Sequence, residues 1–484
     1  MLPPATTRST GLPVCRHAAA TPLFMAVFRP TLMRLLLTLA LALLGAGLCA
    51  LLLPGEWRSI QEQLTGFPDS DVAAHSARPY VLGGLCALPA LAMLVYSFGG
   101  TLDRYIARQF ASIFFICVAS LFLIWFLIDL ADTLGDFRKT SGVIATAATY
   151  YSIRTPAIVL QLLPYALLLS LIFVLGKFSR DREIVAMIQS GHSVIRFSMP
   201  LIGAGVWCSL LCLGLNYHWA PHADGRKTEI LDTARGVLIT KAKHVLYFNA
   251  DNRRLWMVGA FPKNYERGEP LINVEVTVTA PDGGLESRLT ATRARWNRDD
   301  STWTFEEPVR CRFTHDEAPE FEVPDAPIVQ HGWLETPWQL IKPGLAAAYL
   351  GIPDLNGWLR ANALKHHTPP NKNTAAPYLT QWHYRWALPF TCLVTVLLAA
   401  PLSIHFSRRG PGGNVFLAVV LSALMIFISN ITLNFGEAGL LHPALAAWLP
   451  NLVFSLLGLY LFRRRITGRP PFYRSLGRLF TSNS

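Results

Sequence analysis

The chain is poor in charge and lacks the motifs of soluble enzymes. Only 15% of its 484 residues are charged and 52% are hydrophobic, a balance that argues against a water-soluble protein. No G-x-x-x-x-G-K-[ST] sequence occurs, so the chain has no phosphate-binding loop of its own for ATP. The patterns G-x-S-x-G, H-E-x-x-H and C-x-x-C are missing as well. No catalytic motif therefore supports an enzymatic function, and we expect no cofactor.

Disulfide and metal frameworks are not expected either. Of eight cysteines, six lie in apolar runs and only Cys311 lies in the long polar stretch, so no bridge can form within that stretch. Cys208 and Cys212 stand one helical turn apart, which favours small packing residues over a metal pair. The thirteen histidines do not cluster at ligand spacing with carboxylates, and the adjacent His366 and His367 point to different sides of a helix or strand. We predict no metal site.

Long apolar runs are what the chain does have. A helix needs about 20 residues to cross a bilayer, and runs of this kind lie near 35–54, 80–98, 110–131, 155–176, 197–219, 386–404, 414–434 and 443–462. A polar stretch of residues 220–385, ample for a domain with its own core, separates the fifth run from the sixth. The predicted fold class is an α-helical integral membrane protein of about eight spans with one inserted domain. The first run also resembles a signal-peptide core, whose cleavage would leave seven spans.

The distribution of basic residues predicts the orientation. Eighteen Lys and Arg occupy the first 34 residues, the loops 99–110, 177–196 and 405–413 and the tail 463–484. The alternate loops 54–79, 132–154 and 435–442 hold five. Because basic loops stay on the cytoplasmic side, we expect both termini in the cytoplasm and the insert in the periplasm. The net charge of +12 then requires no nucleic-acid partner.

The insert has the pattern of β structure. From Gly236 onward, short alternating segments such as "RLWMVGAF", "LINVEVTVTA" and "STWTFEEPVRCRF" are broken by "PDGG" and "NRDDS", which is typical of antiparallel strands with one buried face. We predict a sandwich or jelly roll. Trp256 and Trp296 are either plain core residues or part of an inner face that holds an apolar ligand.

A short charged segment, "GKFSRDREIVAMIQSGHS" (residues 176–193, here called the hook), joins two spans. On a helix, its apolar residues share one arc beside its charges; Ser179 can cap the start and Gly191 can end it. Such a helix can simply rest on the headgroups of membrane lipids. Alternatively it is a knob that plugs into the groove of a partner, such as a separate ATPase, where Glu183 meets a basic side chain. The candidate coupling residues are Arg182, Glu183, Ile184 and Met187.

Several segments of the sequence together resemble a known family. The segments "LDRYIARQF", "RDREIVAMIQSG", "LNYHWAP", "RLTATRARWNRDDSTWTF", "HYRWALPF" and "LPNLVFSLLGLYLF" occur in order between residues 102 and 461. Together they resemble the YjgP/YjgQ permeases, LptF and LptG, of the lipopolysaccharide export transporter. Residues 1–99 add two spans that common members lack.

The resemblance implies an architecture and partners. It implies an extension (1–99), three spans (100–219) with a coupling helix (179–190), a periplasmic β-jellyroll and connector (220–385), three more spans (386–462) and a basic tail (463–484). It also implies pairing with a second permease of the LptF/LptG type and docking of a cytoplasmic ABC ATPase dimer. Lipopolysaccharide would leave the inner membrane through a cavity between the permeases, enter the jelly roll and pass to periplasmic bridge proteins.

Candidate substrate contacts lie at two places in the spans. Cations near the periplasmic end of the third apolar run can pair with lipid phosphates, although the acids beside them would repel such groups. Ordinary interfacial charges are the alternative. The candidates are Asp129, Arg138 and Lys139, with Asp132 and Asp136 nearby. Asn430 and Asn434 either line the cavity or bond neighbouring helices.

Two other functions stay open on the sequence alone. One is a non-transporting scaffold or sensor whose β domain binds a periplasmic partner. The other is a lipid-modifying membrane enzyme, for which only Asp129, Asp132 and Asp136 offer carboxylates, spread over a helix end. The hook favours the permease, because a scaffold has no reason to dock an ATPase.

Overall fold

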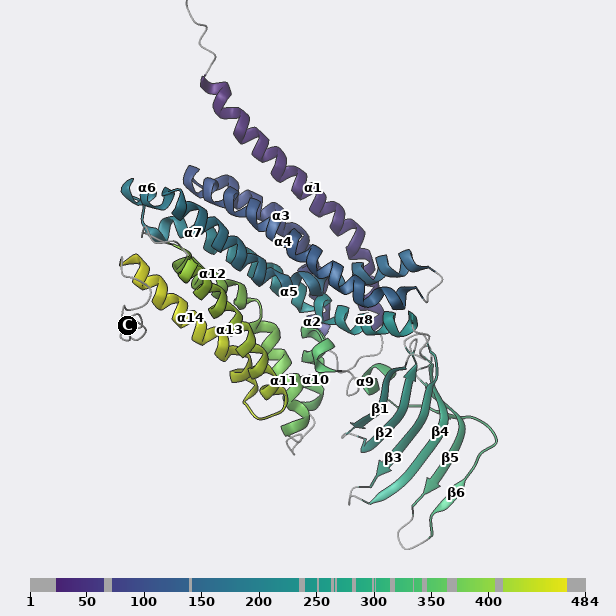
Figure 1. Ribbon diagram of the computed structural model, residues 1–484. Coiled ribbons are helices and arrows are strands. Elements are labelled where there is room, and N and C mark those ends of the chain that lie inside the picture. Colours follow the sequence, from purple (N-terminus) through teal and green to yellow (C-terminus); the bar gives the residue numbers. More distant parts are fainter. Residues whose placement is uncertain are drawn as a thin grey trace, which may run out of the picture.

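The computed structural model describes most of the chain between Leu23 and Thr467. The described residues are 23–64, 72–138, 142–234, 240–249, 252–262, 265, 268–280, 284–297, 300, 302–313, 318–333, 335–341, 346–363, 372–404 and 412–467. They form a bundle of long helices with a β-sheet at one end (Figure 1).

Within the described residues, seven helices are long and apolar enough to cross a membrane. They belong to α1 (Leu23–Leu64), α3 (Arg78–Phe98), α4 (Thr101–Phe137), α5 (Val143–Arg180), α7 (Val194–Tyr217), α13 (Gly412–Glu437) and α14 (Pro443–Ile466). Two further helices, α11 (Lys372–Ala387) and α12 (Phe390–Ser403), are long and apolar enough to span a membrane when they are taken together. The chain bends by 51° at the break between them. Pro389 caps α12 at this break, where proline cannot continue the hydrogen-bond ladder. The eight predicted runs correspond to these seven spans and the bent pair.

The bundle core lies among α5, α7, α12 and α14. Its buried side chains include Leu167, Leu171 and Phe178 of α5 together with Val396 and Leu398 of α12. Glycines let these helices approach closely: a Cβ on Gly205 would lie 2.7 Å from a Val396 methyl carbon, and one on Gly458 3.0 Å from the Leu397 backbone. Close contact through small residues is a common way to hold apolar helices together in lipid.

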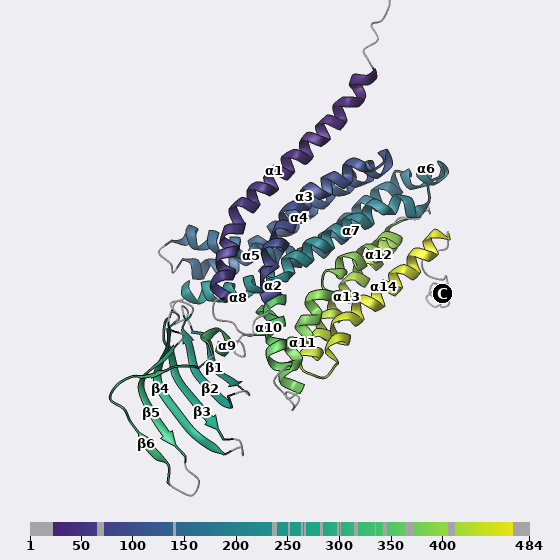
Figure 2. The ribbon, with the colours of Figure 1, turned by 180° about the vertical axis from the view of Figure 1, so that it is seen from behind.

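The N-terminal extension docks on α7 through α3. The indole nitrogen of Trp207 donates to the Leu88 carbonyl at 3.4 Å, and the Tyr217 hydroxyl donates to the Ala74 carbonyl at 2.8 Å. Ala74 lies in the short α2 (Val72–Ser76). In contrast, α1 packs against α3 at the margin of the bundle, and its outer face is exposed leucine (Figures 1 and 2). Two of the predicted spans are thus attached beside the rest.

The insert folds as one antiparallel sheet. Its strands are β1 (Thr240–Asn249), β2 (Arg254–Pro262), β3 (Leu271–Thr279), β4 (Leu285–Asn297), β5 (Thr302–Arg312), β6 (Glu320–Glu322) and β7 (Ile328–Gln330). The order is β1-β2-β3-β4-β5-β6, with β7 also paired to β5. Each neighbour pair is antiparallel, as the alternating segments predict.

A closed sandwich or jelly roll is not confirmed. The described strands form a single open sheet in sequence order, whereas a jelly roll needs crossover connections between two sheets. After β5 the described chain forms only the two three-residue strands β6 and β7, which extend the same sheet. The chain then folds back as α9 (Pro337–Ile341), whose Leu340 and Ile341 are buried with the sheet core.

Further helices connect the sheet to the bundle. α8 (Trp219–Ala234) precedes β1 and packs against α5, while α10 (Ile352–Ala363) and the short 3-10 helix η3 (Ala347–Tyr349) follow the sheet. Residues 364–371, in the Pro- and Asn-rich part of the connector, lie outside the described residues. α11 begins at Lys372 and packs on α13 and α14. The Trp358 and Tyr378 rings stack with centroids 3.7 Å apart and join α10 to α11.

Candidate functional site

The hook forms a short helix, α6 (Glu183–Gln189), between the ends of α5 and α7. Gly191 has φ of 88°, and its amide donates to the Ile188 carbonyl at 3.0 Å. The next amide, that of His192, donates to the Met187 carbonyl at 3.1 Å. This pair of bonds is the Schellman ending, so the predicted glycine stop is confirmed.

The predicted start of the helix is wrong. α5 continues through Arg180, so Ser179 lies inside α5 and Asp181 caps its end. Arg182 then turns the chain with φ of 57° and precedes α6 without a side-chain cap. A left-handed residue, which no sequence pattern around Arg182 indicates, replaces the expected serine cap.

Two of the four predicted coupling residues face the bundle. Ile184 and Met187 are buried in the same core as Phe178 of α5. Their side chains hold α6 against its own chain and leave no surface for a partner. Ile188, one turn further along, is 38% exposed.

The charged residues at the start of α6 face outward. Arg182 is exposed and Glu183 half-exposed. The Tyr105 hydroxyl of α4 donates to Glu183 Oε2 at 2.9 Å, and the Tyr105 ring stacks on Phe178 with centroids 5.9 Å apart. This contact fixes the Glu183 carboxylate while leaving part of it open to solvent.

The candidate substrate acid Asp129 is already paired. Its carboxylate bonds the Arg154 guanidinium of α5, which also donates to the Tyr150 hydroxyl at 2.6 Å and lies 4.6 Å from the centre of the Trp125 ring. Both charged side chains are about six-sevenths buried. The pair links α4 to α5, so the repulsion expected between Asp129 and an anionic lipid is cancelled within the chain.

The other predicted contacts in the spans are exposed or not described. Asp132 and Arg138 are exposed, while Lys139 lies outside the described residues. Asn430 and Asn434 are exposed on α13, one turn apart. Their side chains therefore face away from the described helices of this chain.

Trp256 and Trp296 belong to one aromatic cluster in the sheet. Trp256 is fully buried and its ring lies 5.0 Å from that of Trp303, which lies 5.2 Å from that of the partly buried Trp296. Trp333 covers Trp256 from the side, with centroids 5.4 Å apart. Trp256 therefore belongs to the buried core of the sheet, and Trp296 packs against that core.

A cavity of about 430 Å³ opens beside this core. It has an apolar wall and a rim that carries two arginines and one glutamate; the lining residues are Val276, Val278, Glu286, Ser287, Leu289, Arg310, Arg312, Phe313, Gln330 and Trp333. Arg310 and Arg312 lie at the end of β5, which points away from the bundle (Figure 1). The sequence did not single out these arginines, because charged residues alternate with apolar ones on every strand.

A family model described as the lipopolysaccharide export system permease LptF/LptG matches residues 104–464. The chain belongs to the LptF/LptG family. The resemblance read between residues 102 and 461 is confirmed, and the chain is a multi-pass inner membrane protein of a permease family rather than an enzyme family. The comparison with curated proteins found no match.

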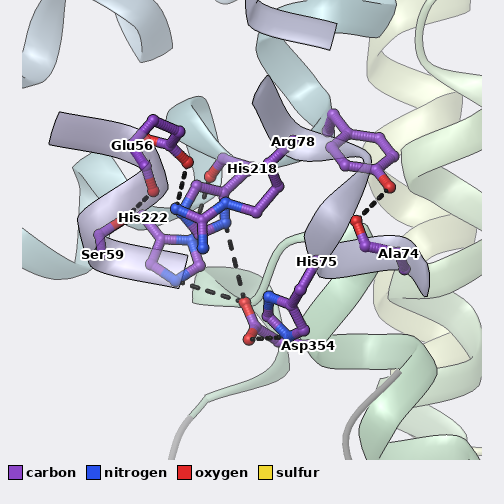
Figure 3. A network of polar contacts seen from close by, with 9 residues as sticks. Glu56, Ser59, Ala74, His75, Arg78, His218, His222 and Asp354 are labelled. Atoms are coloured by element: carbon purple, nitrogen blue, oxygen red, sulfur yellow. Dashed lines mark hydrogen bonds and ion pairs between the residues drawn. The ribbon is translucent and has the colours of Figure 1, made fainter. Parts of the chain in front are cut away.

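The LptF/LptG match leaves the first 103 residues outside it. The helices α1, α2 and α3 therefore lie outside the residues that match the family. A polar network links these helices to one another and to α10: Arg78 at the start of α3 is 2.5 Å from Glu56 of α1, and His75 of α2 is 3.6 Å from Asp354 of α10 (Figure 3).

The same network brings together histidines that were expected to be scattered. His218 Nδ1 and His222 Nε2 lie 4.0 and 3.3 Å from Asp354 Oδ2, and burial lowers the pKa of both imidazoles. The prediction that no histidines cluster with a carboxylate is wrong. The i, i+4 spacing of His218 and His222 was the available signal in the sequence, but Asp354 is distant in the chain.

Proposed function

We propose that this chain is one permease half of a lipopolysaccharide export transporter, and that a separate cytoplasmic ATPase dimer docks on the hook. The main support for this proposal is the geometry of α6. Ile184 and Met187 anchor the helix in the bundle, while Arg182 and Glu183 remain presented beside it. A helix fixed on one side and charged on the other can transmit force from a partner to α5 and α7.

The placement of the hook and the sheet supports the orientation. They lie at opposite ends of the bundle (Figures 1 and 2). The hook end also holds the C-terminus of α14, with Arg463, Arg464 and Arg465 in its last turn. Basic residues gather on the cytoplasmic side, so we assign the hook to the cytoplasm and the sheet to the periplasm.

The path of the lipid follows from this orientation. We place the second permease against the exposed face of α13, where Asn430 and Asn434 and the 62% exposed Phe427 face outward. Lipid enters between the two chains, moves to the open sheet and leaves over its far end toward bridge proteins. The cavity there, with an apolar wall beside Arg310 and Arg312, suits acyl chains next to an anionic group.

Charge reversal at Glu183 tests the docking. Glu183→Lys places a cation where we expect a basic groove, so the amount of ATPase that co-purifies with the chain should fall at least tenfold, or about 1.4 kcal/mol. Lipid-stimulated ATP turnover should fall with it.

Tyr105→Phe is the matched control. It removes the hydrogen bond to Glu183 but keeps the ring and the carboxylate, so docking should remain within about twofold. If Tyr105→Phe reduces ATPase binding as much as Glu183→Lys does, Glu183 acts only within its own chain. If neither variant changes binding, the hook is not the docking site, and the scaffold or sensor function gains support.

A further inference from the structure

A second polar site lies at the sheet end of the bundle, far from the hook (Figures 1 and 3). Its side chains come from four helical segments: His75 of α2, His218 at the end of α7, His222 of α8 and Asp354 of α10. The mechanism of docking and transport uses none of them.

Hydrogen bonding fixes the proton on the His222 ring. Its Nδ1 lies 3.0 Å from the His218 carbonyl oxygen, which can only accept, so Nδ1 carries the hydrogen. In the neutral ring, Nε2 then holds a lone pair, and it points at Asp354 Oδ2 at 3.3 Å. Two atoms that both carry lone pairs repel one another at this distance unless a cation or a proton lies between them.

His218 adds a third donor to the same point. Its side chain is 8% exposed, and its Nδ1 has no hydrogen-bond partner among the described residues. Asp354 Oδ2 likewise has no hydrogen-bond partner among the described residues. Such buried, unsatisfied groups are rare and call for an explanation.

We propose that His218, His222 and Asp354 bind one divalent transition metal ion of the Zn²⁺ type. Their ligand atoms lie within 4.8 Å of one another, and ligands around tetrahedral zinc are about 3.3 Å apart for bonds near 2.0 Å. Small rotations of the three side chains would bring their ligand atoms to the spacing that zinc requires. Neutral imidazole and carboxylate are ligands that zinc and its neighbours prefer.

The surrounding groups fit this assignment. His75 Nε2 is 3.6 Å from Asp354 Oδ1, the oxygen turned away from the other two histidines, so His75 positions the carboxylate as outer partners of metal ligands do. The arginine that acts most strongly on the two histidines is Arg78, whose positive charge is largely neutralised by Glu56 at 2.5 Å. With neutral imidazoles, the carboxylates of Asp354 and Glu56 outweigh that one arginine. Arg226, the other cation that acts on the pair, is exposed.

The metal would tie the extension to the family bundle. All three ligands lie inside the residues that match LptF/LptG, whereas His75, Arg78 and Glu56 lie in the extension. Binding would therefore stabilise the contact of α2 and α3 with α7, α8 and α10.

Metal titration of the full-length chain in detergent tests the site. The protein carries a tag without histidine, is stripped with chelator and is titrated with Zn²⁺ by calorimetry and with Co²⁺ by visible absorption. We expect one ion per chain, a Co²⁺ spectrum of low coordination number and a rise in Tm on addition of Zn²⁺.

Variants identify the ligands. His218→Ala, His222→Ala and Asp354→Asn should each abolish stoichiometric binding and the zinc-dependent rise in Tm. His75→Gln should weaken binding by about 10- to 100-fold, as outer-partner changes do. His383→Ala, on α11 and outside the cluster, is the matched control and should bind as the unaltered chain does. Gel filtration checks that each variant is folded.

Three results would contradict the proposed metal site or its link to the extension. If the unaltered chain binds no more metal than the His218→Ala/His222→Ala double variant does, these residues do not form a metal site. Equal loss in His383→Ala would place the metal elsewhere. A bound ion that gives the same Tm with and without His75 would remove the link to the extension.

Discussion

At the residue scale, the most informative side chains are those whose partners are remote in the sequence. Asp129 was expected to face lipid, but Arg154 of the next helix neutralises it. Glu183 was expected to face a partner, but Tyr105 also holds it. Sequence patterns assign residue types to a face of a helix, whereas they do not reveal which neighbouring helix supplies the opposite charge or donor.

Asp129 and Asp132 provide a matched pair for testing this assignment. Asp129→Asn leaves the buried Arg154 without its counter-charge and should lower the free energy of unfolding by about 3–5 kcal/mol, because an unpaired buried charge is costly. Asp132→Asn, at an exposed position of the same helix, should change it by less than about 0.5 kcal/mol. Denaturant unfolding in detergent measures both.

The contrary result is equally clear. If Asp129→Asn leaves stability unchanged but reduces lipid binding, Asp129 contacts the substrate after all, and its pairing with Arg154 is secondary.

At the element scale, regular patterns predicted most helices and strands. Period-two alternation located β2, β3, β4 and β5, and runs of about 20 apolar residues located the spans. The openness of the sheet was not predictable in this way, since it depends on the short strands after β5 and on α9 instead of on any alternating run. α11 was missed because Pro377 and its polar residues obscure a helix that tertiary contacts stabilise, such as the bond from Trp382 Nε1 to Asn356 Oδ1 at 2.6 Å.

The end of α6 offers a test at this scale. Gly191 has φ of 88°, and an L side chain in this region costs roughly 1–2 kcal/mol. Gly191→Ala should therefore loosen α6, raising hydrogen exchange of the amides of residues 183–192 by about fivefold or more. It should also weaken ATPase co-purification.

Gly176→Ala is the control, because it lies inside α5 with open space around the added methyl group. It should leave exchange in α6 unchanged. Equal exchange in both variants would show that the glycine ending does not hold the hook in place.

At the scale of the whole molecule, the hook and the open sheet lie at opposite ends of the spans. In the proposed function the hook receives force from the ATPase, the spans transmit it, and the open sheet accepts lipid at the far end. The helices α1, α2 and α3 pack beside the other spans, and the family match begins only after them. Their attachment could not be inferred from the sequence, since it depends on contacts such as His75 with Asp354, which are almost 280 positions apart.

Photo-crosslinking at Phe313 tests the central claim most directly. A benzophenone amino acid replaces Phe313, which lines the cavity of the sheet, or, as the control, Phe248, which is 46% exposed on β1. The chain is assembled with its partner permease and ATPase in proteoliposomes that contain lipopolysaccharide. We predict crosslinks to lipopolysaccharide at position 313 that appear only with ATP, are absent at position 248 and are lost in Glu183→Lys. Crosslinks at position 313 that form equally without ATP, or none at all while the complex hydrolyses ATP, would contradict the account.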